Sequence, residues 1–403
     1  MRSRRCPITA ILLLSLTASV PCGAAEPLGL YVRDGVVFRG GKPYRGIGAN
    51  YFSLFSRRLK DPSDTSYRSQ LKQLSEARIP FVRFMCGGFW PIDCELYLRD
   101  KRAYFALLDD VVEAAGENDI GLIPSLFWHM STVPDIVGEP IDQLGNPDSK
   151  SIRFIRRYTE EVVTRYQDSP AIWGWEFGNE YNLHADLPNA ATHRPPVWPQ
   201  LKTARRRTER DELTSAHLLE ALAAFAQSVR RHDKTRLLIS GNSIPRPSAW
   251  HNTAQRSWQE DSVDQFGRIL LRDNPDPIGT ISVHLYPREN NEYSGRAKDV
   301  AQLIGIVQRY AHRAKKPLFI GEFGVPAQLD TEEERALFEE LTTAIAAGGV
   351  PLAAFWVFDH PQQNKTWNVT FDNRRAYMLE IIGRANARIG RPSKSAKSTD
   401  GSL

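Results

Sequence analysis

Eight short runs of apolar and β-branched residues alternate with helical patterns along most of this chain, and that alternation restricts the possible folds more than any other feature. Most of the runs are nearly continuous in apolar residues, as is typical of strands that are buried on both faces. The expected strands are Tyr44–Phe52, Pro80–Met85, Ile120–Phe127, Ile172–Glu180, Thr235–Ser243, Thr280–Pro287, Pro317–Gly324 and Ala353–His360. Between them, apolar residues recur every three or four positions, which indicates amphipathic helices. The expected helices are Tyr67–Arg78, Ala103–Asn118, Ser151–Gln167, Glu212–His232, Asp299–Arg313 and Glu332–Ala347, with a weaker one at Ser262–Leu271.

This order predicts an α/β fold, either a (β/α)8 TIM barrel or an open doubly wound sheet. The count of eight runs, and a first strand that no glycine-rich phosphate turn follows, favour the barrel. The strand-to-helix connections are long, especially Tyr181–Asp211 and Ile244–Asp261, as expected at the end of a barrel that carries its site. Before the first strand, alternating apolar residues flank Asp34-Gly35, which predicts an N-terminal β-hairpin.

The two ends of the chain differ from its middle. Residues 1–25 have the pattern of a signal peptide, with a basic start, an apolar run too short to span a bilayer, and small residues before Glu26. An uncleaved anchor is the alternative. We expect a secreted or periplasmic protein without stable membrane association, with one catalytic domain over residues 26–390. Residues 391–403 are rich in serine and lysine and are expected to be a disordered tail.

Charge and cysteine content restrict the possible partners. Without the three arginines of residues 1–25, the formal charge of +5 falls to +2, and the sequence has no basic footprint of the kind that binds nucleic acid. Cys86 and Cys94 remain in an exported chain, so we expect a disulfide between them, with two free buried thiols as the alternative. No cysteine pair has zinc-ligand spacing. We expect no metal, no cofactor, no nucleic-acid partner and a monomer.

Two carboxylates are distinguished by their positions at strand ends. Glu180 ends the fourth run, in Trp-Glu-Phe-Gly-Asn-Glu, and Glu322 ends the seventh, in Ile-Gly-Glu-Phe-Gly. The carboxyl ends of barrel strands meet at one rim, and strands four and seven lie across the mouth from each other. One such glutamate could equally be a solvated strand end or a helix cap. Two on opposed strands indicate a shared cleft.

Other polar and aromatic residues stand at further strand ends, and together they resemble a known family. They are Arg83 in Phe-Val-Arg-Phe, Asn179 before Glu180, His284 and Tyr286 in His-Leu-Tyr-Pro, and Trp356 in Phe-Trp-Val. Taken in order, these motifs resemble the clan A glycoside hydrolases, and glycoside hydrolase family 5 in particular, the family of cellulases and β-mannanases. The resemblance covers the chain from the hairpin to the eighth strand. It implies retaining hydrolysis by double displacement, with Glu180 as acid/base and Glu322 as nucleophile.

Each supporting residue has a physical reason for its place. Arg83 beside Glu322 would lower the pKa of that carboxyl, while apolar walls would raise the pKa of Glu180. Asn179 could hydrogen-bond the sugar 2-hydroxyl, a contact that strengthens at the transition state. A structural ion pair within the barrel is the alternative for Arg83, and a brace of the strand end is the alternative for Asn179.

The strand-end rings have two interpretations each. Tyr286 could donate to the nucleophile, His284 could line the subsite or bond the acid/base, and Trp356 offers a flat face for a sugar ring. A satisfied core histidine and a core tryptophan are the alternatives. His129, after the third strand, is a weaker candidate for sugar contact. The loops add four tryptophans that could bind sugar or simply close the barrel mouth: Trp90, Trp250, Trp258 and Trp367.

One departure from the family pattern bears on the substrate. Many members have proline directly after the Asn-Glu pair, whereas here Tyr181 and a long loop follow. The expected substrate is a β-linked hexose polysaccharide or oligosaccharide. The layout leans towards an endo-β-mannanase, with an endo-β-glucanase close behind, and exo action or transglycosylation remains open if the loops block one end. A non-catalytic carbohydrate-binding barrel is the alternative from another class, and a metal-dependent barrel hydrolase would need a His-x-His on strand one that is missing.

Overall fold

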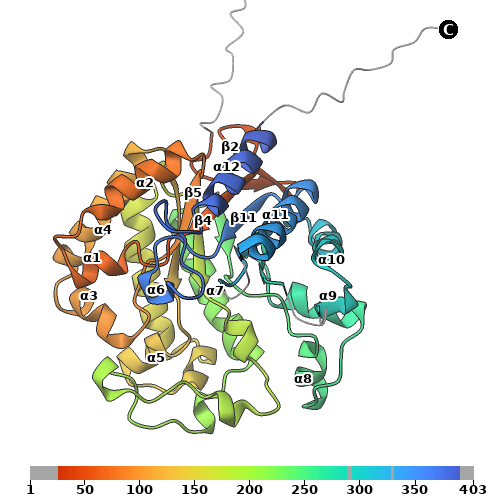
Figure 1. Cartoon of the computed structure of the whole chain (residues 1–403). Helices are drawn as coiled ribbons and strands as arrows, with labels where there is room; N and C mark the ends of the chain where they lie inside the picture. The colour runs from red at the N-terminus through yellow and green to blue at the C-terminus, as the bar shows by residue number, and fades with distance from the viewer. Residues whose placement is uncertain (1–25, 288–292, 328–330, 391–403) are drawn as a thin grey trace, which may run out of the picture.

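The computed structural model describes residues 26–287, 293–327 and 331–390, and in them eight parallel strands form a (β/α)8 barrel (Figure 1). Consecutive strands pair in parallel, and β11 returns to pair with β4. Between β8 and β9 the amide of Gly279 donates to the carbonyl of Leu238 at 3.0 Å, which nearly closes the ring. The barrel strands are β4 (Gly46–Asn50), β5 (Phe81–Met85), β6 (Gly121–Phe127), β7 (Gly174–Gly178), β8 (Leu237–Ile239), β9 (Ile281–Leu285), β10 (Leu318–Phe323) and β11 (Leu352–Phe355).

The barrel prediction is therefore confirmed. Seven of the expected runs contain an observed strand, and β11 begins one residue before its expected run. The expected runs continue beyond the carboxyl ends of six of the eight strands, into the loops of the rim.

Helices surround the barrel, and their first turns are capped as their sequences suggest. The side chains of Ser149 and Thr214 accept from first-turn amides of α6 and α7. The helices are α1 (Ser56–Lys60), α2 (Ser66–Glu76), α3 (Glu95–Arg99), α4 (Lys101–Glu117), α5 (Thr132–Val137), α6 (Lys150–Tyr166), α7 (Ser215–His232), α8 (Ala249–Gln255), α9 (Val263–Arg272), α10 (Val300–Arg313), α11 (Thr331–Ala347) and α12 (Tyr377–Ile389). None of the helices in the described ranges has the length and apolarity needed to cross a bilayer.

Helix α12 follows the last barrel strand and packs its apolar face into the large core cluster, and one of its amide side chains also binds the backbone of β4. Asn386 accepts from the backbone amide of Ile47 and donates to the carbonyl of the same residue, both at 2.8 Å. This pair copies a strand–strand hydrogen-bond pattern, so a helix occupies a place where β4 would otherwise present unpaired groups to water.

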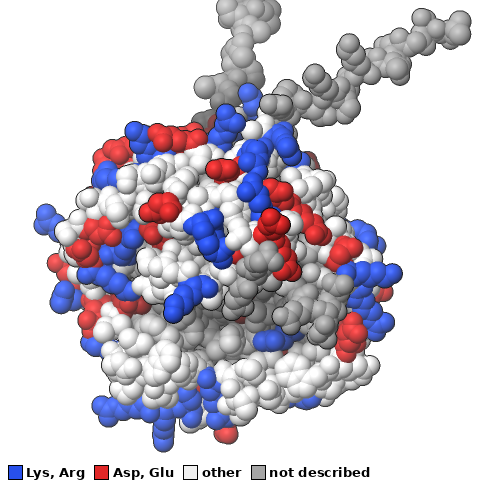
Figure 2. Space-filling model, in the orientation of Figure 1, with Lys and Arg blue, Asp and Glu red and all other residues white. Residues whose placement is uncertain are grey.

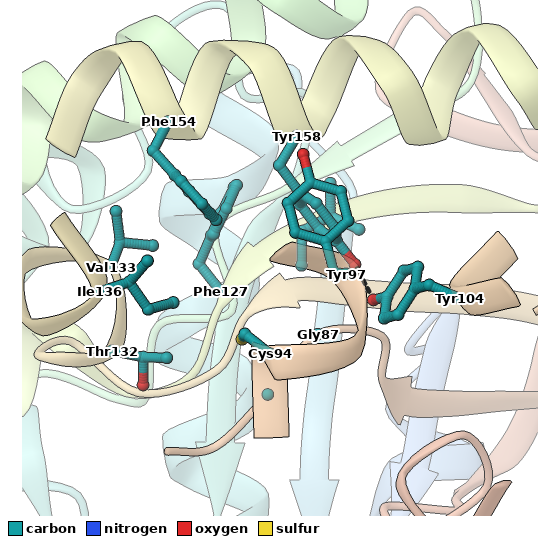
Figure 3. A pocket seen from close by; sticks show the side chains of 12 residues that line it. Gly87, Cys94, Tyr97, Tyr104, Phe127, Thr132, Val133, Ile136, Phe154 and Tyr158 are labelled. Atoms are coloured by element: carbon teal, nitrogen blue, oxygen red, sulfur yellow. Dashed lines mark hydrogen bonds between the residues drawn. The ribbon is translucent and has the colours of Figure 1, made fainter. Parts of the chain in front are cut away.

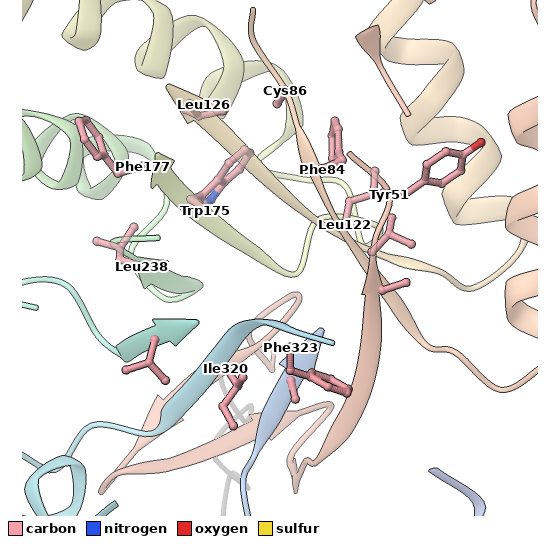
Figure 4. Packing of buried hydrophobic residues seen from close by; sticks show 14 of the residues in the cluster. Tyr51, Phe84, Cys86, Leu122, Leu126, Trp175, Phe177, Leu238, Ile320 and Phe323 are labelled. Carbon is pink, nitrogen blue, oxygen red and sulfur yellow. The ribbon is translucent and has the colours of Figure 1, made fainter. Parts of the chain in front are cut away.

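Strand residues alternate between the helix layer and the barrel interior. In β7, Trp175 and Phe177 belong to the large apolar cluster under the helices, whereas Glu176 between them points the other way and is fully buried. Figure 4 shows part of this outer cluster, including Phe84 of β5 and Phe323 of β10. Both faces of each strand are buried, which is why the runs read as continuous apolar stretches.

The predicted hairpin closes the amino-terminal end of the barrel. Strands β1 (Tyr31–Arg33) and β2 (Val36–Arg39) pair antiparallel, and the turn residues Asp34 and Gly35 both have positive φ, at 51° and 77°. A short β3 (Lys42–Pro43) extends the sheet. Leu30 and Val37 pack into a separate apolar cluster with residues from the barrel interior. These residues are Phe81, Ile123, Trp173, Leu237, Ile239, Phe319, Leu352 and Ala354. In Figure 1, this amino-terminal end of the barrel is at the top, with β2 and α12. The long yellow-green connection between β7 and α7 lies at the opposite end.

The predicted signal peptide and the predicted tail lie outside the described residues. Figure 2 shows basic and acidic side chains side by side over the visible face, around a hollow near its centre.

Candidate active site

The two glutamates predicted from strand ends face each other at the carboxyl rim. Glu322 lies within β10 and is only 5 % exposed. Glu180 lies two residues after β7, where its backbone turns into the left-handed region at φ 54°. One carboxylate oxygen of each glutamate and one nitrogen of His284 all lie within 4.8 Å of one another. Opposed strands therefore bring both acids to one point, as the sequence predicted.

Arg83 is the centre of the hydrogen-bond network below the two glutamates. Its guanidinium is fully buried, and Nη1 donates to Oε1 of Glu322 at 2.9 Å and to Oδ1 of Asn50 at 2.9 Å. Its Nη2 donates to Oδ1 of Asn179 at 2.7 Å. Its Nε lies 2.8 and 2.9 Å from the two carboxylate oxygens of Glu176. One cation thus fixes a rim carboxylate, a rim amide and a buried carboxylate at once.

Glu176 and Asn50 are parts of this network that the sequence reasoning missed. Glu176 is the single charged residue of an apolar strand, and it stands directly between Trp175 and Phe177. Asn50 ends β4 and donates through Nδ2 to the carbonyl of Gly321 at 2.8 Å, directly before Glu322. A lone polar residue on the inward face of a buried strand is the signal that could have identified both.

His284 and Tyr286 follow each other on the β9 side of the site. Tyr286 donates through its hydroxyl to Oε2 of Glu322 at 2.7 Å, as predicted. His284 Nδ1 lies 2.9 Å from Oε1 of Glu180 and 3.6 Å from Oε2 of Glu322. His284 therefore bridges the two acids.

The acidities of the two glutamates differ from the sequence prediction. Burial raises the pKa of Glu322, and the opposing charges of His284 and Arg83 offset only part of that rise. Burial would also raise the pKa of Glu180, but the hydrogen bond and charge of His284 outweigh it and lower the pKa. The expected separation, with Glu322 lowered and Glu180 raised, is wrong for the free protein, because Glu322 is the more buried of the two and His284 lies nearer to Glu180.

Comparison with known proteins gives the family. The model of the cellulase family (glycosyl hydrolase family 5) matches residues 48–357, most of the chain. The chain belongs to glycosyl hydrolase family 5. The residues that bore the resemblance in the sequence are the same ones that meet at the rim of this family 5 barrel.

Solved structures support the fold of this family 5 protein. The endo-1,4-β-mannanase from Rhizomucor miehei matches with a TM-score of 0.61 and 17% identity, over 89% of this chain and 99% of that one. The endo-β-1,4-mannanase from Thermotoga petrophila matches with a TM-score of 0.61 and 15% identity, over 87% and 77%. A family 5 mannosidase from Rhizomucor miehei matches with a TM-score of 0.62 and 12% identity, over 91% and 99%. By sequence, none of the curated proteins matches the chain.

Aromatic rings cover the β4–β6 side of the site in this family 5 barrel. Trp356 lies directly after β11, partly exposed, and its Nε1 donates to Oε1 of Gln363 at 2.9 Å. The centroid of the Trp128 ring lies 6.1 Å from that of Trp356. The Arg83 guanidinium lies over the Trp128 ring, 4.5 Å from its centroid. Trp356 therefore presents a partly exposed ring at the rim, next to Trp128 and Phe52.

His129 is part of this aromatic group and stays uncharged there. Its ring stacks on Phe89 at 5.0 Å and contacts Trp90 at 5.0 Å. Burial lowers the pKa of His129 to about 3, with smaller contributions from the charges of His184 and Arg207. The structure therefore places His129 behind a layer of rings, where it is a neutral packing and hydrogen-bonding group.

The four loop tryptophans separate into different surroundings. Trp90 contacts His129 and Trp198, and Trp367 lies 5.2 Å from the ring of Tyr286, so these two lie near the site. Trp250 packs on His251 within the β8–α9 connection, and Trp258 is 51 % exposed there.

The predicted disulfide is wrong, because the structure has Cys86 and Cys94 as free thiols. The Cys94 side chain points into an apolar cavity that Phe127, Val133 and Tyr158 also line (Figure 3). Burial raises the pKa of both thiols to about 12. The two cysteines are close in sequence, but the turn between β5 and α3 directs each thiol into different packing. Neither acid of the site lines this cavity.

Among the described residues, one group of side chains has the spacing to ligate a metal ion, and it is the acid pair with His284. The guanidinium of Arg83 already lies 2.9 Å from Glu322. A metal ion placed between the acids would be repelled by that fixed positive charge, so Arg83 disfavours a resident metal there.

Proposed function

We propose that this family 5 protein is a retaining glycosidase that hydrolyses β-linked hexose polysaccharides or oligosaccharides, with Glu322 as nucleophile and Glu180 as general acid/base. One observation carries the proposal: a carboxylate oxygen of Glu180 and one of Glu322 lie within 4.8 Å. Retaining enzymes place their carboxyl groups about 5–5.5 Å apart, whereas inverting enzymes leave about 6.5–9.5 Å for a water molecule. The short spacing supports direct attack on the sugar.

In the first step a Glu322 oxygen attacks the anomeric carbon while Glu180 protonates the departing glycosidic oxygen. Arg83 and Tyr286 each donate to a different oxygen of Glu322, which orients the carboxylate. Asn179 accepts a hydrogen bond from Arg83 through Oδ1, so its NH2 group is the part that can donate to a sugar hydroxyl. In the second step Glu180 takes a proton from water, and that water releases the sugar from Glu322.

The acid must carry a proton, and substrate binding supplies a reason why it can. Two carboxyl groups this close titrate as a coupled pair. In the free protein the Glu180 side chain is 31 % exposed and that of Glu322 is 6 % exposed. A bound sugar would cover the more exposed acid, and loss of water raises the pKa of a carboxyl group. Binding therefore moves the shared proton towards Glu180.

A β-mannan is the favoured substrate, with a β-glucan as the second candidate. The mannan assignment rests on solved neighbours that are named mannanases and a mannosidase. Assays on mannan, glucomannan and carboxymethyl-cellulose, each followed by reducing-sugar release, separate the two.

The catalytic assignment is tested with paired glutamate variants. Glu322→Gln should lower kcat on the order of 10⁴–10⁶-fold, the range seen when the nucleophile or its base is removed from a hydrolase. Glu180→Gln should cost about 10²–10⁴-fold, and less on aryl glycosides, whose leaving group needs little protonation. Glu113→Gln, at an exposed helix position, is the control. Proton NMR of the first product should show the β-anomer.

Two outcomes would reject the proposal. An α-anomer formed first would exclude retention. Binding of mannan by both wild type and Glu322→Gln, with no hydrolysis by either, would favour the non-catalytic carbohydrate-binding barrel. Export through residues 1–25 remains a prediction, since that segment lies outside the described residues.

A further inference from the structure

In the proposed hydrolase, a row of aromatic rings lies on one side of the acid pair. We infer that it acts from the non-reducing end and releases one hexose at a time, in place of the internal cleavage expected from the sequence. The inference rests on the proposed function and goes further by assigning the mode of action.

The positions of Trp356 and the two acids give the direction of the substrate. Trp356 follows β11, which neighbours β10 on the side away from β9. A sugar that stacks on Trp356 with its anomeric carbon at Glu322 therefore lies on the β11–β4–β5 side. The glycosidic oxygen lies at Glu180, and the leaving group departs towards β8 and β9. The β11–β4–β5 side is consequently the non-reducing side of the bound chain.

A continuous row of rings closes that side, and we call it the aromatic fence. Its members come from loops after four different strands, and each ring contacts the next. The centroid distances are 4.8 Å for His360–Phe52, 6.3 Å for Phe52–Phe89, 4.9 Å for Phe89–Trp90 and 5.0 Å for Trp90–Trp198. The first four rings are partly exposed and Trp198 is 43 % exposed, so the fence lies at the rim and not in the core.

Among the described residues, the rings beyond Trp356 pack too closely to admit a sugar ring between them. Phe52 lies 6.0 Å from the Trp356 ring. A ring inserted between two others needs about 7–8 Å between their planes, twice the usual carbon contact distance of 3.5–4.0 Å. The two rings of each link are already in contact, so no such space exists between them. Most links are also edge-to-face or tilted, so the rings do not form one flat platform on which a longer chain could stack.

Charged pairs anchor both ends of the fence, and the Arg207–Asp135 pair among them is buried. Near His360, the carboxylate of Asp359 accepts from Arg57 at 2.6 Å and from Gln70 at 2.7 Å. At the other end, the connection from β7 to α7 crosses in front of β6: Arg207 forms two hydrogen bonds of 2.7 Å with Asp135 in α5. Lys202 of the same connection pairs with Glu95 of α3, after β5. These contacts hold Trp198 against Trp90.

Cleavage of mannohexaose and cellohexaose, each labelled at the reducing end, tests the mode of action. The expected first products are an unlabelled monosaccharide and a labelled pentasaccharide, followed by stepwise shortening. Labelled products of mixed length from the first minute would overturn the inference and leave the proposed hydrolase intact. No turnover of either oligosaccharide or of aryl β-mannoside and β-glucoside would overturn both.

A fence variant makes the test specific to these rings. Trp90→Ala removes the contacts to both Phe89 and Trp198, and it should shift the first products from monosaccharide towards disaccharide and longer units. Val197→Ala is the matched control, because Val197 is 37 % exposed on the same connection and is not a fence residue. A Trp90→Ala enzyme that still releases only monosaccharide, with unchanged KM for the hexasaccharides, would show that the fence does not limit the glycone side.

Discussion

At the scale of single residues, Arg83 combines the two roles that its sequence position left open. It is a structural ion pair with Glu176 in the barrel interior, and it is also a support for Glu322 at the rim. The guanidinium offsets one of the two carboxylate charges and hydrogen-bonds both carboxylates, so neither acid is buried without a cationic partner. The same cation that stabilises the fold thus positions the candidate nucleophile.

His284 should determine the pH range of activity. Its charge lowers the pKa of both Glu180 and Glu322. Glu322 must be ionised, so activity appears as pH rises through its pKa. Glu180 must be protonated, so activity is lost as pH rises through its pKa. His284→Asn keeps a donor near the Nδ1 position without the charge, and both limbs of the kcat/KM profile should move to higher pH.

The control for that experiment is His232→Asn at the exposed end of α7, which should leave the profile unchanged. Limbs that stay in place, or move to lower pH, in His284→Asn would contradict the role assigned to the histidine.

At the scale of elements, the connection between β7 and α7 is an ordered wall. Arg207 and Asp135 have side chains that are 5 % and 0 % exposed, and they pair through both carboxylate oxygens. The sequence shows a run of charged residues here, Arg205-Arg206-Arg207, which by itself favours a solvated loop. In the structure, Asp135 of α5 pairs with Arg207 of that run, and the pair is buried.

Asp135→Asn should therefore destabilise the protein by up to about 3–5 kcal/mol, since the buried Arg207 keeps only the longer 3.5 Å contact to Asp211 as a counter-charge. Urea unfolding measures the loss. The double variant Asp135→Leu/Arg207→Met should recover part of it, because the buried guanidinium is removed while Asp211 keeps the amide of Thr208 as a donor. Asp142→Asn is the control: its partner Arg210 is 55 % exposed, and such pairs contribute about 0–1 kcal/mol. Equal losses in Asp135→Asn and Asp142→Asn would contradict the anchor.

At the scale of the whole molecule, the hairpin and the site occupy opposite ends of one barrel. The amide of Leu30 donates to the carbonyl of Trp173 and its carbonyl accepts from Leu237, both at 2.8 Å, so the hairpin entry is stitched to β7 and β8. The barrel interior is apolar at the hairpin end, and it holds Arg83 and Glu176 towards the end that carries the site. Stability is therefore concentrated at one end and chemistry at the other.

Leu30→Ala should separate these two properties. Leu30 is fully buried under the barrel, so its truncation should cost about 2–5 kcal/mol of unfolding free energy while kcat per folded molecule stays near wild type. Leu28→Ala, 41 % exposed, is the control and should change stability by less than about 0.5 kcal/mol. A large fall in kcat without loss of stability in Leu30→Ala would refute the separation.

The sequence alone determined the barrel and its rim residues, because both depend on local patterns. Continuous apolar runs predict strands that are buried on both faces, and a residue at the carboxyl end of a strand lies at the rim in any barrel of this kind. Tertiary structure alone decided the rest. It placed Glu176 on Arg83, kept Cys86 and Cys94 apart, and reversed the expected acidities of Glu180 and Glu322. It also joined rings from four loops into a fence. These features depend on which distant side chains meet and on how deeply each is buried, and neither is encoded in the neighbours of a residue along the chain.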